Sequence, residues 1–117
     1  MIIKREKLIL LAVAMIIYTR VKSNSFIHGY QTKQCELFSE YFGVKYSALM
    51  RFVGYMKQMY LINRIPANIT QLEWEFLNSL NALNNDEIIN LINSVIYVKA
   101  KSDVNLFFVF GEHKWIN

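Results

Sequence analysis

The stretch FSEYFGVKYSALMRFVGYMKQMYLIN, residues 38–63, decides the fold. Apolar residues recur at helical spacing on both sides of Gly43–Val44, which predicts two helices that meet at a glycine turn. The second half carries Lys45, Arg51 and Lys57 and no acidic residue. Two interpretations follow: a helix-turn-helix that reads DNA, or two core helices that happen to meet at a glycine.

Periodicity and capping residues predict further helices on either side of this stretch. Residues 70–73, TQLE, form a capping box, in which the Thr70 hydroxyl and the Glu73 carboxylate each satisfy a free amide at the start of a helix. The expected helices are Leu8–Val21, one capped by Thr32 that ends at Gly43, Tyr46–Met59, one that begins at Thr70, and a short one that begins at Asn85.

Two β-rich runs follow, SVIYVKA (94–100) and VNLFFVF (104–110), and they predict a C-terminal β-hairpin. The 117 residues suit one domain with a single core. The expected fold is therefore α+β and mostly helical: a helix-turn-helix core of three helices, two further helices and a C-terminal β-hairpin. Residues 1–64 form its basic part, and residues 65–117 hold the helix pair and the hairpin.

Charge is segregated along the chain. Residues 1–64 hold ten Lys or Arg against three acids, whereas residues 65–117 hold three Lys against six acids. No Asp or Glu occurs between Tyr41 and Leu72. Because ordinary surfaces mix the two signs, this segregation favours an anionic partner for the N-terminal half, either nucleic acid or membrane.

The apolar run Leu8–Tyr18 follows three basic residues, an outline shared with secretory signals. Arg20 and Lys22 lie where a cleavage region would avoid charge, and eleven apolar residues are too few to span a bilayer. We therefore expect no membrane partner, and a helix that is apolar on all sides and buried in a core or in a dimer seam. The residues expected at the dimer interface are Leu8, Leu11, Met15 and Tyr18.

Residues 34–62 resemble the helix-turn-helix of the winged-helix DNA-binding superfamily. Ser39, Gly43 and Val44 stand where that family has a small residue at the helix crossing, a glycine turn and a hydrophobe. The resemblance implies that the next helix buries Leu49, Val53 and Met56 and ends in a hydrophobic pair, here Leu61–Ile62. Tyr60 departs from the family, which usually has glycine before that pair, and Pro66 and a helix stand where the wing would follow.

In such folds the opposite face of the second helix contacts DNA. The resemblance thus implies a small transcription regulator that occupies double-stranded DNA as a homodimer. The residues expected to bind DNA are Lys33, Lys45, Tyr46, Ser47, Met50, Arg51, Lys57 and Gln58.

Other classes of site are weakly supported. His28 and His113 have no metal-ligand spacing, no phosphate-binding glycine loop exists, and Cys35 falls on the inward face of its helix. We expect no enzyme, no metal and no cofactor, and a single cysteine favours the cytoplasm. The alternative function is a protein-interaction module, such as an adaptor, chaperone or inhibitor, without a nucleic-acid role. A third alternative is a membrane-associated protein held by its first 18 residues.

Overall fold

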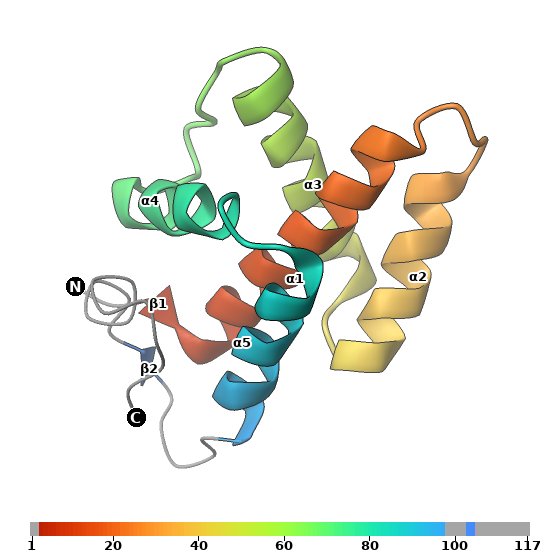
Figure 1. Ribbon diagram of the computed structural model, residues 1–117. Helices are drawn as coiled ribbons and strands as arrows, with labels where there is room; N and C mark the ends of the chain where they lie inside the picture. Colours follow the sequence, from red (N-terminus) through yellow and green to blue (C-terminus); the bar gives the residue numbers. More distant parts are fainter. Residues whose placement is uncertain (1–2, 98–102, 105–117) are drawn as a thin grey trace.

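The computed structural model describes residues 3–97 and 103–104, and these residues fold mostly into helices (Figure 1). A pair of two-residue antiparallel strands accompanies the helices, with Ile3 opposite Val104. The mostly helical character expected from the sequence is confirmed. The elements are β1 (Ile3–Lys4), α1 (Arg5–Ser23), α2 (Tyr30–Phe42), α3 (Tyr46–Leu61), α4 (Gln71–Leu80), α5 (Asn85–Tyr97) and β2 (Asp103–Val104).

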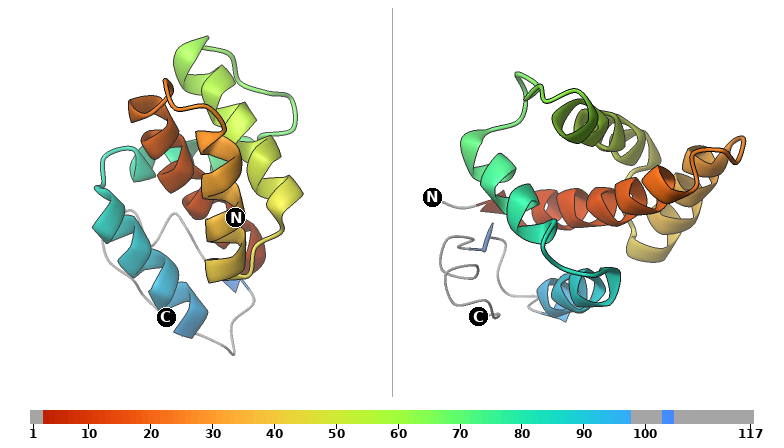
Figure 2. Two further views of the ribbon diagram at one scale, coloured as in Figure 1. Left: turned by 90° about the vertical axis from the view of Figure 1, so that its right-hand side faces the viewer. Right: turned by 45° about the horizontal axis from the view of Figure 1, so that its top comes forward.

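Helix α1 is the centre of the fold. It contacts each of the other four helices, which surround it in the views of Figure 2. A helix that is apolar around its whole circumference is stable in water only when neighbours cover every side. From Leu11 to Tyr18 all of its residues are buried, and among the described helices α1 contributes more buried hydrophobic residues to the core than any other.

This position corrects the expected dimer seam. Leu8, Leu11 and Met15 are 0% exposed and Tyr18 is 2% exposed within a single chain. The helices of the same chain already cover these four side chains, which leaves them no surface for a second copy. The sequence allowed this helix to lie either in a core or in a dimer seam, and the structure places it in the core.

The glycine turn between α2 and α3 forms as the sequence predicts. Gly43 ends α2 with φ at 68°, in the left-handed region that a Cβ disfavours. The backbone N–H groups of Gly43 and Val44 both donate to the Ser39 carbonyl oxygen, the latter at 3.0 Å. This closure of the helix end sets the direction in which α3 leaves.

The capping box of α4 is also confirmed. Thr70 Oγ1 accepts from the Glu73 backbone N–H at 3.1 Å, and Glu73 Oε1 accepts from the Thr70 backbone N–H at 3.0 Å. Glu73 Oε2 lies 3.6 Å from Lys7 Nζ. The cap residue therefore also joins α4 to the start of α1.

The prediction of a C-terminal hairpin is wrong for the beginning of its first strand. Ser94–Tyr97 form the last turn of α5, and Ser94 Oγ donates to the Asn90 carbonyl oxygen at 3.0 Å. Ile88, Leu91 and Ile92 are buried, and the sequence continues their helical spacing to Val95. That register outweighs the β propensity of the run. Apart from Asp103 and Val104, the rest of the predicted hairpin lies outside the described residues.

Candidate nucleic-acid interface on helix α3

Helix α3 has the two faces that the sequence predicts. Leu49, Val53 and Met56 are 0% exposed, at the spacing i, i+4 and i+7. On the opposite side Ser47 and Arg51 are exposed, and Gly54 and Gln58 are half-buried. We call Ser47, Arg51, Gly54 and Gln58 the outward face of α3.

Arg51 is the charged residue of the outward face. Its guanidinium lies 5.8 Å from the centre of the Phe52 ring, a cation–π contact that leaves its N–H groups available. Among the residues that the structure describes, no carboxylate forms an ion pair with Arg51. Glu36 and Glu40 on α2, the partners that a core-helix interpretation would assign to it, are not paired with it.

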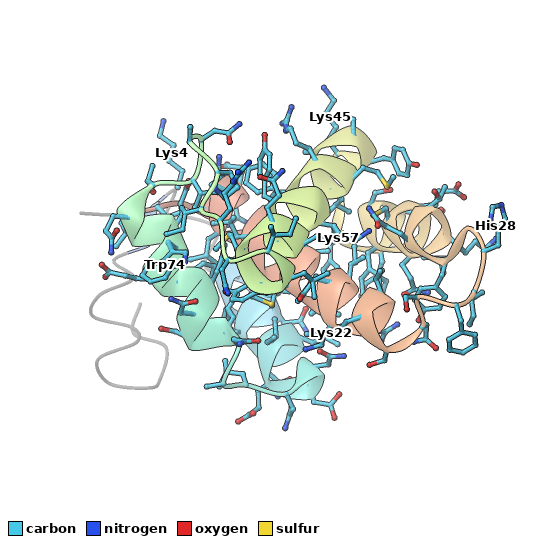
Figure 3. The ribbon with its side chains drawn as sticks, turned by 90° about the horizontal axis from the view of Figure 1, so that it is seen from above. Lys4, Lys22, His28, Lys45, Lys57 and Trp74 are labelled. Atoms are coloured by element: carbon cyan, nitrogen blue, oxygen red, sulfur yellow. The ribbon has the colours of Figure 1, made fainter. Side chains whose placement is uncertain are left out.

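Lys45 and Tyr46 stand at the start of α3. Both are exposed, and Figure 3 shows Lys45 pointing away from the other helices. The first turn of α3 contains no acidic residue. The positive end of the helix dipole therefore adds to the charge of Lys45 there.

Two of the expected contact residues face α2. Lys57 Nζ donates to Gln31 Oε1, and Gln31 Nε2 lies 3.9 Å from Met50 Sδ. Lys57 and Met50 are half-buried as a result, and Figure 3 places Lys57 between the two helices. These two residues join α2 to α3 and are not part of the outward face.

Lys33 is exposed on α2. It follows Gln31 by two residues, which turns it about 200° around the helix from the side that contacts α3. Lys33 is therefore separated from the outward face of α3, contrary to the expectation that both serve one surface.

The loop after α3 brings a basic residue that the sequence reasoning missed. Asn63 has φ at 56°, and after this reversal the Arg64 backbone N–H donates to the Gln58 carbonyl oxygen at 3.0 Å. Asn68 Nδ2 donates to Tyr55 Oη at 2.6 Å, which holds the loop against α3. Exposed Arg64 thus adjoins Gln58. The signal was present in the sequence, since the acid-free interval includes this loop.

The hydrophobic pair at the end of α3 lies at the surface. Leu61 is 62% and Ile62 is 67% exposed, and Ile65 nearby in the chain is 51% exposed. The resemblance predicted this pair from its position, but the pair does not contribute to the core. Its exposure is the observation that favours a protein-interaction role.

Cys35 has the environment of an inert thiol. It is fully buried, as the spacing predicts, and burial raises the pKa of its thiol to about 11 against a smaller opposing effect of Lys57. The thiolate, which is the nucleophile, is therefore scarce at neutral pH. No group of three or more His, Cys, Asp or Glu side chains that could hold a metal occurs in the described part of the chain. His28 is exposed, and His113 lies outside that part.

Comparison with known proteins identifies no relative: neither a family model, nor a curated protein, nor a solved structure matches the chain. Within the described residues, no helix combines the length and apolarity that crossing a membrane requires. The geometry of the chain itself therefore carries the functional argument.

Proposed function

We propose that the protein binds double-stranded DNA through the outward face of α3 and acts as a transcription regulator by occupancy. Arg51 carries the proposal, because it is exposed, has no acidic partner among the described residues, and projects from the helix that follows a glycine turn. A helix of this kind fits the major groove, where arginine can donate two hydrogen bonds to guanine.

The roles of the other residues follow from their positions. Ser47 and Gln58 lie on the same outward face as Arg51 and could contact base edges. Lys45 and Arg64 stand at the two ends of α3 and would neutralise phosphates, which positions the helix without reading sequence. Lys57 is assigned a structural role, since its ammonium group is bonded to α2.

A salt titration with random and selected duplex DNA tests this proposal. Two phosphate neutralisations (Lys45 and Arg64) predict a slope of log K against log salt of about −1.8, a loss of about twelvefold between roughly 50 and 200 mM. A homodimer would double the slope and lose about 150-fold over the same range. Absence of binding at the lowest salt that keeps the protein in solution would refute the proposal.

The second candidate function is protein binding through the exposed residues Leu61, Ile62 and Ile65. Exposed apolar side chains that cluster in this way are typical of interaction sites. Under this alternative, substitution of Leu61 or Ile62 by Ser changes partner binding, whereas substitution of Arg51 has no effect. A dimer would also need a surface such as this one, because the α1 residues are inside the core.

A further inference from the structure

The loop between α1 and α2, residues 24–29, carries the most exposed large apolar side chain of the described residues. Phe26 is 81% exposed and its neighbour Ile27 is 43% exposed. The loop projects from one extremity of the molecule, at the far end of α1 (Figure 2, right). Leaving an aromatic ring in water at a projecting tip costs hydrophobic free energy that a partner could recover.

The chain's own hydrogen bonds shape this loop. The Ile27 backbone N–H donates to the Asn24 carbonyl oxygen at 3.0 Å, and Asn24 Nδ2 donates to the Arg20 carbonyl oxygen at 2.8 Å. Gly29, with φ at 74°, then turns the chain into α2. Phe26 is therefore presented outward by a closed local structure and needs no ordering before it binds.

The chain on either side of the tip is basic. No Asp or Glu occurs from Lys7 to Cys35, and the exposed residues Lys22 and Lys33 flank the loop in sequence. Lys22 Nζ lies over the Tyr18 ring at 5.7 Å from its centre. Within residues 3–94, whose side chains the structure describes, no acid balances these cations in an ion pair.

We infer that this loop is a docking tip for an anionic phospholipid surface. Phe26 and Ile27 would enter the boundary between headgroups and acyl chains, where aromatic side chains are favoured, and Lys22 and Lys33 would remain among the anionic headgroups. Two adjacent apolar residues on a narrow convex tip suit a fluid surface better than a protein groove, which requires a broader complementary patch. The resulting attachment is reversible.

This inference does not rest on DNA binding. The tip and the outward face of α3 are separate, and in Figure 3 His28 at the tip and Lys45 at the start of α3 point in different directions. A substitution at either place should therefore leave the other activity intact.

Co-sedimentation with vesicles tests the inference on the full chain. We expect binding to phosphatidylcholine vesicles that contain about a third phosphatidylserine, and weak or no binding to pure phosphatidylcholine. Phe26→Ser should weaken the first by about ten- to a hundredfold, the effect of one buried phenylalanine side chain. Tyr41→Ser, at a residue 74% exposed near the other end of α2, is the matched control and should bind as the unaltered protein does.

A second measurement reports insertion directly. Phe26→Cys labelled with a polarity-sensitive dye should shift its emission to the blue on anionic vesicles, and labelling should be selective because Cys35 is fully buried. Three outcomes would overturn the inference: no binding to either vesicle, equal binding by Phe26→Ser and the unaltered protein, or an effect of Phe26→Ser on DNA binding in place of vesicle binding, which would indicate a side chain inserted between bases.

Discussion

Arg51 and Lys57 lie within two turns of one another on α3, yet their surroundings assign them different roles. Arg51 is exposed against the ring of Phe52. Lys57 is half-buried and donates to Gln31 of α2. The first is free to contact a ligand, and the second stabilises the contact between two helices.

Alanine at each position should separate these roles. Arg51→Ala should leave the melting temperature nearly unchanged, because an exposed charge contributes little to stability, and should cost about 1–3 kcal/mol of specific DNA binding. Lys57→Ala should destabilise the fold by about 0.5–1.5 kcal/mol through the lost hydrogen bond and leave the salt slope unchanged. Thermal melts and binding isotherms measure the two effects, and the reverse assignment would contradict the structure.

The glycines Gly43 and Gly54 form a second matched pair. Apart from the adjacent backbone and chain neighbours, neither has an atom within 4 Å of the place where a Cβ would stand, so backbone conformation decides the outcome. Gly43→Ala should destabilise the protein by about 1–2 kcal/mol, because alanine resists its φ of 68°. Gly54→Ala should stabilise it by up to about 1 kcal/mol, as expected inside a helix.

Gly54→Ala also bears on DNA binding. Gly54 belongs to the outward face, where the absence of a side chain permits close approach of a DNA backbone. Weaker DNA binding by this more stable variant would support the proposed contact. Unchanged binding would indicate that the DNA does not approach the middle of α3.

At the scale of elements, the apolar period predicted the described helices better than their caps did. The cap expected at Thr32 is wrong, because α2 begins at Tyr30 after Gly29 and has no side-chain cap hydrogen bond. Two local predictions are confirmed: the Thr70 hydroxyl caps α4, and Gly43 ends α2 in a left-handed turn. Ser94–Tyr97 were predicted as strand from their β-branched content. The helical register that begins at Ile88 determines their conformation, and that register is set by burial against α1.

In the candidate site, the sequence predicted only the positions that are set within a single helix. The outward position of Arg51 follows from a period of 3.6 residues within one helix. The position of Lys57 depends on where α2 lies, and that of Arg64 on a loop that folds back to Gln58. Both are tertiary facts without a local sequence pattern.

The placement of α1 in the core leads to a distinct expectation for its variants. Leu11→Ala removes a fully buried side chain and should destabilise the monomer by about 2–5 kcal/mol. Urea denaturation should show the same loss at every protein concentration. A destabilisation that disappears as the protein concentration rises would instead indicate that Leu11 lies at an interface between chains.

For the whole molecule, the titration of buried groups predicts sensitivity to alkali. Burial raises the pKa of Cys35 from 9.0 to about 11 and, with the nearby Tyr18, that of Tyr60 from 10.0 to about 12. Burial also raises the pKa of Tyr18. Because the unfolded chain releases these protons at lower pH than the folded one, stability is fully present below about pH 9 and falls as the pH rises further.

Denaturation midpoints between pH 8 and pH 11 measure this decline. Cys35→Ala should be less stable at pH 8, since it removes buried atoms, and should show a shallower decline between about pH 9 and pH 10 because one titrating group is gone. An unchanged slope would mean that the thiol ionises alike in both states.

The central place of α1 has a consequence during synthesis, because α1 precedes every helix that covers it. The apolar segment that ends at Tyr18 leaves the ribosome first, whereas the last residues that bury it belong to α5 and extend to Ile92. At roughly 5–20 residues per second, translation of the intervening chain takes about 4–15 seconds. Until α5 has been made, the nascent chain presents an incompletely covered, signal-like helix to chaperones and targeting factors. The segment that holds the finished fold together is thus the one that the growing chain most needs to have shielded.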